Sequence, residues 1–301
     1  MKNIFVLVNP FAGNGRAVVV AKKVLKTLKD LNARIHLKVI KQFEKISDII
    51  KDLTDPFDYL VIIGGDGTVR SAVEGILRGK KDYILGTYPG GSGGEVSHFA
   101  KTLSILSLKN ALLKTCVKEI DVFNADVTLT IGSRASYHFV ANLQIGHFAF
   151  GIQQTPKIAK KLFGGVGYMI GVLRALLKRE NALSHVIGDK KKIFSGRIYT
   201  IHFGNMPTTR GGVPVAPLAD PSDSKIDIML AKALTKKEAF EALPQVLKGE
   251  HLKHPAVIYD QLKTVYVKSE GDHIAIDGEY LGLFKELRIR FSGKVKILCN
   301  H

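Results

Sequence analysis

Apolar positions in the first 120 residues follow two alternating patterns. Short, continuous runs rich in β-branched residues are typical of strands buried on both faces of a sheet, and between them apolar residues recur at helical spacing. The runs predict strands at 3–10, 34–40, 59–65 and 83–89, and the helical spacing predicts helices at 17–31, near 44–53 and from 68 onward. Such alternation predicts a doubly wound α/β domain, whose ligands bind at the carboxyl ends of its strands.

The pattern changes at about residue 120 to one of mostly strands. The predicted strands are 120–132, 135–146, 195–205, 225–234, 264–270 and 273–279. Their pattern favours an antiparallel β-sandwich as a second domain, so we divide the chain into residues 1–120 and 121–280.

One helical stretch, residues 159–179, interrupts these strands and is apolar on most of its surface. The segment from Lys157 to Arg197 holds ten Lys or Arg residues against two acids. An apolar helix beside cations suits a membrane-surface contact or the wall of an apolar acyl pocket. A helix that simply covers the sheet is the third interpretation, and all three stay open.

Three predicted strands end in Gly-rich loops, which read NPFAGNGRA (9–17), GGDGT (64–68) and TYPGGSGGE (87–95). Glycines between a strand and a helix allow backbone N–H groups and the helix N-terminus to approach a phosphate, and Thr68 is placed to cap the helix that follows. Asp66, an acid within an anion site, suggests a cation such as Mg²⁺ that arrives with a nucleotide. Ordinary turn chemistry is the alternative for a single loop, whereas three successive loops favour a nucleotide site.

Composition narrows the choice of partner and compartment. The chain is 46% hydrophobic and 24% charged, which is typical of a soluble globular protein, but its net charge is +17. This excess favours an anionic membrane surface or phosphorylated substrates, with a basic surface kept for solubility as the alternative. We expect no nucleic-acid partner, because no DNA- or RNA-binding motif accompanies the charge and the chain has no Trp.

The compartment expected from the sequence is the cytoplasm. Cys116 and Cys299 form neither a CxxC motif nor a cysteine–histidine cluster, so we expect reduced thiols. The N-terminal apolar run leads directly into a Gly-rich loop and is interpreted as a strand, not a signal peptide. No apolar stretch reaches the roughly 20 residues that span a bilayer.

Five motifs give the chain a family resemblance. They are VNPFAGNGRA (8–17), GGDGT (64–68), YPGGSGGEVSHFAK (88–101), GNMPTTRGGVPVAPLADPSDSKIDIML (204–230) and IDGE (276–279). Their order resembles that of the diacylglycerol kinase catalytic domain family, which includes bacterial soluble lipid kinases and sphingosine kinases. NAD kinases share GGDGT, but the GGVPVAPLAD and IDGE elements distinguish the lipid kinases.

The resemblance implies a fold and an activity. It implies a Rossmann-like nucleotide domain and a C-terminal β-sandwich lipid domain, with the active site in the cleft and residues 281–301 returning to the first domain. The implied activity is that of a lipid kinase that uses ATP and Mg²⁺ to phosphorylate a hydroxyl of a membrane lipid: diacylglycerol, a sphingoid base or phosphatidylglycerol. The implied partners are its lipid substrate and anionic lipid at a membrane surface, with which it associates peripherally, and a homodimer stays open.

The resemblance also implies site residues. The expected phosphate and nucleotide contacts are Asn9, Pro10, Gly13, Gly15, Gly64, Gly65, Gly67, Thr68, Gly91, Ser92 and Gly93. Asp66 is expected near Mg²⁺ and is one candidate for the general base. Asp277 and Glu279 are the other candidates, since alternate residues of an extended strand face the same way.

A second cation is implied near PLADPSDSKID. Asp220, Asp223 and Asp227 are the available carboxylates there, although Asp-Pro and Ser-Asp-Ser are also ordinary turn sequences.

Several positions depart from the family pattern. Arg70 and Ser71 stand where Asn-Glu is usual, Gly94 and Glu95 stand where Asn-Asp is usual, and GHFAF (146–150) lacks the usual acid. These changes surround the nucleotide and the lipid head group, which favours altered substrate choice over lost catalysis. Two alternatives remain: a protein of the same fold that binds lipid or nucleotide without turnover, and an NAD kinase-like enzyme that acts on a soluble hydroxyl.

Overall fold

Two long strands, β5 (Val117–Leu129) and β13 (Glu279–Leu298), each have residues in both compact parts of the chain. The computed structural model describes residues 1–90, 94–156, 165–178, 181–209 and 212–300. Residues 1–120 with 293–301 form one compact unit, and residues 121–292 form the other. The segment that returns to the first unit therefore begins at Gly293, whereas 281–292 pack with the second.

The first unit contains a parallel sheet. Its strands are β1 (Lys2–Val8), β2 (Ala33–Val39), β3 (Tyr59–Gly64) and β4 (Ile84–Pro89), in the order β4-β3-β1-β2. The end of β13 adds a further parallel pairing beside β4, where Ile297 lies opposite Leu85. All six residues of β3 are buried, which explains why it appears in the sequence as one unbroken apolar run.

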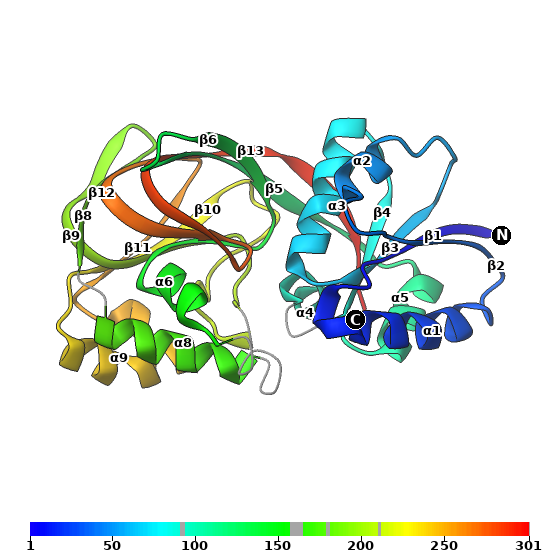
Figure 1. Cartoon of the computed structure of the whole chain (residues 1–301), viewed down its shortest axis with the longest axis horizontal. Coiled ribbons are helices and arrows are strands. Elements are labelled where there is room, and N and C mark those ends of the chain that lie inside the picture. The colour runs from blue at the N-terminus through cyan, green and yellow to red at the C-terminus, as the bar shows by residue number, and fades with distance from the viewer. Residues whose placement is uncertain (91–93, 157–164, 179–180, 210–211, 301) are drawn as a thin grey trace. The chain divides into compact units, whose positions relative to one another are not determined.

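Helices cover both faces of this sheet, as Figure 1 shows. They are α1 (Arg16–Leu28), α2 (Ile46–Lys51), α3 (Asp66–Gly79), α4 (Glu95–Phe99) and α5 (Ile105–Lys114), with a short 3-10 turn η1 (Ala12–Gly15) before α1. α1 and α5 share a core with β1 and β3, and α2 packs against α3 on the opposite side. This is the doubly wound architecture expected from the sequence.

The second unit is built mainly from antiparallel strands. These are β6 (Arg134–Phe139), β7 (Asn142–Gly146), β8 (Ala182–Gly188), β9 (Lys191–Gly204), β10 (Ile226–Lys232), β11 (Val257–Leu262) and β12 (Thr264–Ile276), together with parts of β5 and β13. The main order is β11-β10-β9-β7-β12-β13, and β8 pairs with both β9 and β12. Phe123, Phe139, Phe203 and Phe284 are fully buried in its core.

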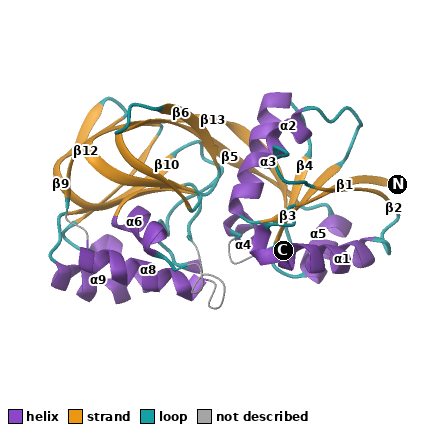
Figure 2. Ribbon diagram, in the orientation of Figure 1, coloured by secondary structure: helices purple, strands orange, loops and turns teal. Residues whose placement is uncertain are grey.

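Helices α6 (His147–Gln154), α8 (Gly165–Lys178) and α9 (Lys236–Lys248) gather on one side of these strands (Figure 2), followed by the 3-10 turn η3 (His251–Lys253). α8 corresponds to part of the helix expected at 159–179, whose residues 159–164 and 179 lie outside the described structure. Within the described ranges, no helix is long and apolar enough to cross a membrane.

The strands beneath these helices carry different side chains on their two faces. On β7 and β9, Leu143 and Phe203 belong to the sandwich core. The alternate residues Gln144 and His202 lie opposite each other on the other face, and both are buried. Thr200 has the same orientation as His202 and lines a pocket beneath the helices. The helices therefore bury a partly polar sheet face.

Candidate active site

The GGDGT loop joins β3 to α3. α3 begins at Asp66, two residues earlier than expected, and its N-cap is Gly65, which has extended backbone and provides no side-chain cap. The prediction that Thr68 caps this helix is therefore wrong. Thr68 lies inside the first turn, where its Oγ1 accepts a hydrogen bond of 2.9 Å from Asn9 Nδ2, so its hydroxyl connects the first Gly-rich loop to the second.

The three glycines of this loop differ in what the surrounding structure requires of them. A Cβ on Gly64 would lie 2.5 Å from the Cβ of Thr68, so packing alone requires glycine there. Among the residues that the structure describes, no atom lies within 4 Å of the position a Cβ would take on Gly65 or Gly67, and neither residue has a positive φ. Neither local packing nor backbone conformation requires glycine at these two positions. Their lack of side chains leaves open space beside the backbone at the start of a helix.

The first Gly-rich loop has a similar relation to α1. Asn9 Oδ1 accepts the N–H of Phe11 at 3.0 Å, while Pro10 between them is half-buried. Gly13 and Gly15 adopt positive φ angles of 59° and 87°, and Gly15 is the N-cap of α1. The first turn of α1 contains no acidic residue, so its positive dipole end remains available to an anion.

Asp66 connects the second loop to the third. Its side chain is 5% exposed, and its Oδ1 accepts the N–H of Glu95 at 2.9 Å. Gly90 N–H donates to the Gly64 carbonyl at 2.7 Å. The hydrogen bonds of Asn9, Gly64 and Asp66 thus join the three loops that the sequence predicted to converge. The expected nucleotide contacts Gly91, Ser92 and Gly93 lie outside the described residues.

In the second unit, Asp277 occupies a tight turn and not an extended strand. Asp277 and Gly278 have φ angles of 43° and 73° and form the two-residue connection between β12 and β13. The expected strand at 273–279 therefore ends at Ile276. Asp277 and Glu279 do not face the same way as expected, since Asp277 is buried and Glu279 is exposed.

The Asp277 carboxylate is held by backbone groups at the start of β7. Oδ1 accepts N–H groups from Ala141 and Asn142 at 3.1 and 3.0 Å, and Oδ2 accepts that of Val140 at 3.4 Å. These bonds fix the orientation of the carboxylate. The catalytic roles of Asp277 and Glu279 stay predictions.

The acids expected to hold a second cation make local contacts. Asp220 Oδ1 accepts the N–H and hydroxyl of Ser222 at 2.9 and 2.6 Å, and Asp223 Oδ1 accepts the Lys225 N–H. Both are turn contacts of the kind the sequence also suggested. Among the described residues, no three His, Cys, Asp or Glu side chains are grouped so that they could hold a metal ion.

Asp227 lies on β10 and is fully buried. Its Oδ1 accepts the Tyr259 hydroxyl at 2.6 Å and Gln261 Nε2 at 3.3 Å. Burial raises the pKa of Asp227, although the hydrogen bond from Tyr259 opposes this effect. A role for Asp227 in cation binding stays a prediction.

An apolar pocket lies under the helices of the second unit. Its lining comes from α6, α8, α9 and the strands below: Phe148, Val172, Leu173, Leu176, Tyr199, Thr200, Met229, Ala231, Leu234, Ala239, Phe240, Ala242, Leu243, Val246, His251, His254 and Val257. The described part of α8 covers the sheet face and also lines this pocket, so two of the three interpretations of the apolar helix apply together, and its membrane contact stays a prediction.

α9 supplies five of these lining residues and was not among the helices expected from the sequence. A signal was present: Thr235 and Glu238 form a capping box, in which each side chain bonds the other's backbone N–H.

Comparison with known families agrees with the motif order. A family model described as the diacylglycerol kinase catalytic domain matches residues 3–125, and one described as the YegS C-terminal NAD kinase beta sandwich-like domain matches residues 151–297. The chain therefore contains a diacylglycerol kinase catalytic domain followed by a YegS-type C-terminal domain. This confirms the recognition made from the motifs, and with it the enzyme class, a phosphotransferase of the diacylglycerol kinase type.

Two curated relatives match about three quarters of the chain's length. A diacylglycerol kinase of Staphylococcus carnosus is 26% identical over 231 residues, which is 76% of this chain and 72% of the relative. One from Staphylococcus aureus is 25% identical over 245 residues, covering 79% and 75% of the two chains.

Solved structures support the two-domain fold. A diacylglycerol kinase from Bacillus anthracis matches with a TM-score of 0.73 and 18% identity, over 99% of this chain and 97% of that one. An NAD kinase from Archaeoglobus fulgidus in complex with ATP matches with a TM-score of 0.52 and 12% identity, over 100% and 94%. At these identities the likeness shows the fold: an N-terminal α/β domain and a C-terminal β-sandwich.

Proposed function

We propose that the protein is an ATP- and Mg²⁺-dependent lipid kinase that transfers the γ-phosphoryl group to a hydroxyl of a membrane lipid. The observation that carries this proposal is the open space beside Gly65 and Gly67, which flank the buried Asp66 at the N-terminus of α3. Phosphoryl transfer depends on positioning and charge stabilisation, and this arrangement is suited to both.

The phosphate chain would lie against the glycine backbone. Without side chains at Gly65 and Gly67, a phosphate can approach the N–H groups at the start of α3, and the helix dipole favours its negative charge. The hydrogen bond between Asn9 and Thr68 keeps the first loop, with Gly13 and Gly15, beside this position. These contacts support the nucleotide residues named from the sequence.

Asp66 suits the Mg²⁺ that accompanies a nucleotide. Mg²⁺ in kinases is usually held by one or two carboxylates together with substrate phosphates and water, so a single buried carboxylate at the phosphate site matches that donor set. When bound, the ion would neutralise charge that develops on the phosphates. The Asp66 carboxylate is oriented for such a role by the Glu95 N–H.

A carboxylate must also receive the proton of the lipid hydroxyl. Asp66 is one candidate for this general base, and Asp277 and Glu279 are the two others. The N–H groups of residues 140–142 hold the Asp277 carboxylate in a fixed orientation, as a general base requires.

The lipid part of the proposal rests on the second unit. Its pocket is lined mainly by aliphatic and aromatic side chains, which suits an acyl chain. Diacylglycerol is our first choice of substrate because the curated relatives are named diacylglycerol kinases. A sphingoid base or phosphatidylglycerol offers a similar hydroxyl. The net charge of +17 favours peripheral attachment to anionic lipid from the cytoplasmic side.

The test is transfer of labelled phosphate from ATP into a mixture of lipids in anionic vesicles, with and without Mg²⁺. We expect one lipid class to be labelled only when Mg²⁺ is present. Asp66→Asn and Asp277→Asn should each lower turnover by about 10²- to 10⁴-fold, the usual contribution of an acid–base group. Asp82→Asn is the matched control, because Asp82 is an exposed acid of the first unit paired with Lys296.

Near-normal turnover of Asp66→Asn would overturn its assignment. If no lipid is labelled while ATP still binds, the protein is a binding protein of the same fold. Labelling of a soluble nucleotide such as NAD in the absence of lipid would favour the NAD kinase-like alternative.

A further inference from the structure

The hairpin between β8 and β9 presents consecutive lysines at its tip. Asp189 and Lys190 form its two-residue turn, with φ angles of 47° and 66°, and Lys191 and Lys192 follow directly. Such a turn matches the twist of the two strands and holds the tip in one conformation. The lysines therefore project from a defined edge of the second unit.

Asp189 anchors this tip to the turn between β11 and β12. Its carboxylate accepts the N–H groups of Lys263 and Thr264 and the Thr264 hydroxyl, at 2.8 to 3.2 Å. Burial alone would raise the pKa of Asp189, but these hydrogen bonds outweigh it and lower the pKa. The Asp189 carboxylate is thus occupied by these hydrogen bonds. The same bonds place Lys263 beside the hairpin lysines.

The strand register continues this basic edge across the sheet. Lys192 lies opposite Ile187 on β8, Ile187 lies opposite Tyr266 on β12, and Tyr266 lies opposite Arg288 on β13. Paired residues project from the same face of a sheet. Ile187 is 39% exposed while its neighbour Val186 is buried, so this row faces solvent.

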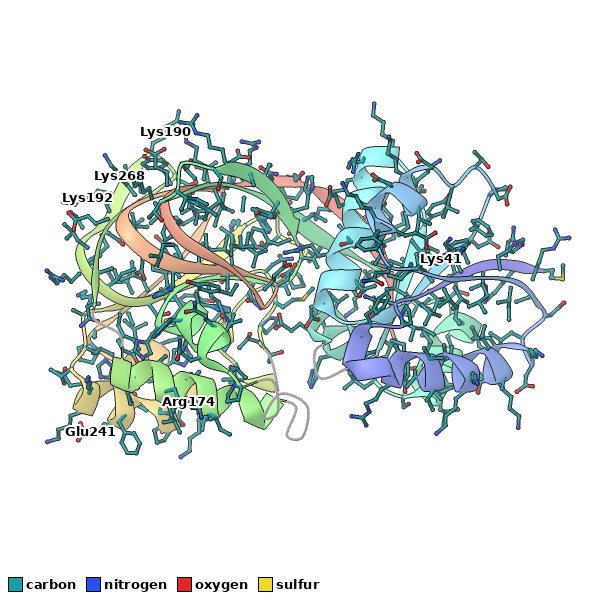
Figure 3. All side chains as sticks on the ribbon, viewed as in Figure 1. Lys41, Arg174, Lys190, Lys192, Glu241 and Lys268 are labelled. Carbon is teal, nitrogen blue, oxygen red and sulfur yellow. The ribbon has the colours of Figure 1, made fainter. Side chains whose placement is uncertain are left out.

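A second row runs parallel to the first. His185 lies opposite Lys268, and Lys268 lies opposite Glu286. Among the residues described, no carboxylate lies within 4.0 Å of the Nζ of Lys190, Lys192 or Lys268. These three lysines lie together at one end of the second unit in Figure 3.

We propose that this surface, which we call the hairpin face and define by Lys190, Lys192, Ile187, Tyr266 and Lys268, docks the protein on an anionic membrane. Its cations match the negative surface potential of anionic lipid. Ile187, an exposed aliphatic side chain among them, suits the boundary between head groups and acyl chains. The inference rests on the proposed lipid kinase function for its purpose, because such an enzyme must reach a bilayer.

The geometry favours a membrane over single-stranded nucleic acid. Nucleic-acid sheets read bases by stacking them on open aromatic rings. The Tyr266 ring instead has the guanidinium of Arg288 over it, 5.4 Å from its centroid. This face offers charge and an aliphatic contact, but its aromatic ring is already covered.

The test is sedimentation with phosphatidylcholine vesicles that contain or lack phosphatidylglycerol. The variant combines Lys190→Asn, Lys192→Gln and Lys268→Gln, with asparagine chosen at 190 because it tolerates positive φ. Partition onto anionic vesicles should fall by on the order of 100-fold, or about 5-fold per lysine. The matched control, Lys22→Gln, Lys23→Gln and Lys26→Gln on exposed positions of α1, removes equal charge and should retain most of the binding.

Equal losses of vesicle binding in both triple variants would show that only net charge matters and would overturn the proposal that the hairpin face is the docking surface. So would unchanged vesicle binding, or binding of wild type to single-stranded RNA but not to anionic vesicles. Phosphorylation of diacylglycerol in neutral detergent micelles is measured separately and should be the same in wild type and the hairpin variant. If wild type phosphorylates neither diacylglycerol nor the two other proposed lipids in micelles, the kinase proposal fails while the vesicle result still decides the docking proposal.

Discussion

At the scale of single residues, the glycines of GGDGT separate a structural requirement from a functional one. Gly64 lacks a side chain because Thr68 occupies the space, whereas Gly65 and Gly67 border open space. A sequence motif alone cannot make this distinction, because all three positions carry the same letter. The structure turns it into opposite expectations for the same substitution.

Gly67→Ala should leave folding intact and impair the kinase. Alanine is favoured over glycine in a helix by about 1 kcal/mol, so the free energy of unfolding should stay equal or rise slightly. Its methyl group would enter the proposed phosphate space, and Mg²⁺-ATP affinity should fall by about 10-fold or more. Denaturant unfolding and nucleotide titration measure the two effects.

Gly64→Ala is the matched comparison. Its Cβ would lie 2.5 Å from that of Thr68, so we expect about 1 to 3 kcal/mol of destabilisation. If Gly67→Ala binds Mg²⁺-ATP as wild type does, the phosphate does not lie beside that residue.

At the scale of elements, the buried strands were predicted correctly from the sequence, whereas a helix without fully buried residues was missed. β1 and β3 were found because strands buried on both faces appear as unbroken apolar runs. α9 was missed although Phe240, Leu243 and Val246 recur at helical spacing, because Pro244 interrupts the pattern and none of its residues is fully buried. The turn at Asp277 and Gly278 was predictable, since Asp-Gly between two strands is a strong hairpin signal.

The hydrogen bonds that join the loops were beyond prediction from sequence. The bond from Glu95 to Asp66 depends on the relative placement of two loops that are separated by β4, and residue spacing carries no information about that distance. What spacing did predict was that the loops meet at one edge of a parallel sheet.

α9 should be the least protected long helix of the second unit. It has no fully buried residue, it contains Pro244, and the capping box of Thr235 and Glu238 fixes its first turn. Thr235→Ala should lower the stability of this helix by about 1 kcal/mol and raise the hydrogen-exchange rates of its amides about 5-fold. Lys237→Ala, an exposed change in the same turn, is the control. Equal exchange rates in wild type and Thr235→Ala would contradict a capping role.

At the scale of the whole molecule, each unit has its own hydrophobic core. The core of the first unit joins β1 and β3 to α1 and α5, and that of the second lies within the sandwich. Separate cores favour separate cooperative transitions on heating. Mg²⁺-ATP should identify the transition of the first unit, because a ligand stabilises only the part that binds it, by about 2.7 kcal/mol at 100 times its dissociation constant.

Acid should act selectively on the second unit. Burial lowers the pKa of His202 to about 3, with a further contribution from the charge of His251, and burial also lowers the pKa of His251. An unfolded histidine titrates near 6.5, so below about that pH the unfolded chain binds protons that the folded unit cannot. Protonation of His202 in the unfolded chain should therefore lower the free energy of unfolding of the second unit by about 1.4 kcal/mol for each pH unit between about 6.5 and 3.

Scanning calorimetry over this pH range measures the effect. Mg²⁺-ATP is present to identify the unfolding transition of the first unit, and the midpoint temperature of the other transition, that of the second unit, should fall selectively with pH. His202→Gln removes the buried titrating group, so its transition should depend less steeply on pH even if the variant is less stable at neutral pH. A transition that falls equally steeply in wild type and His202→Gln would place the acid sensitivity elsewhere. His202 lies on the sheet face beneath the pocket helices, so the same titration limits the pH range over which the proposed lipid pocket can persist.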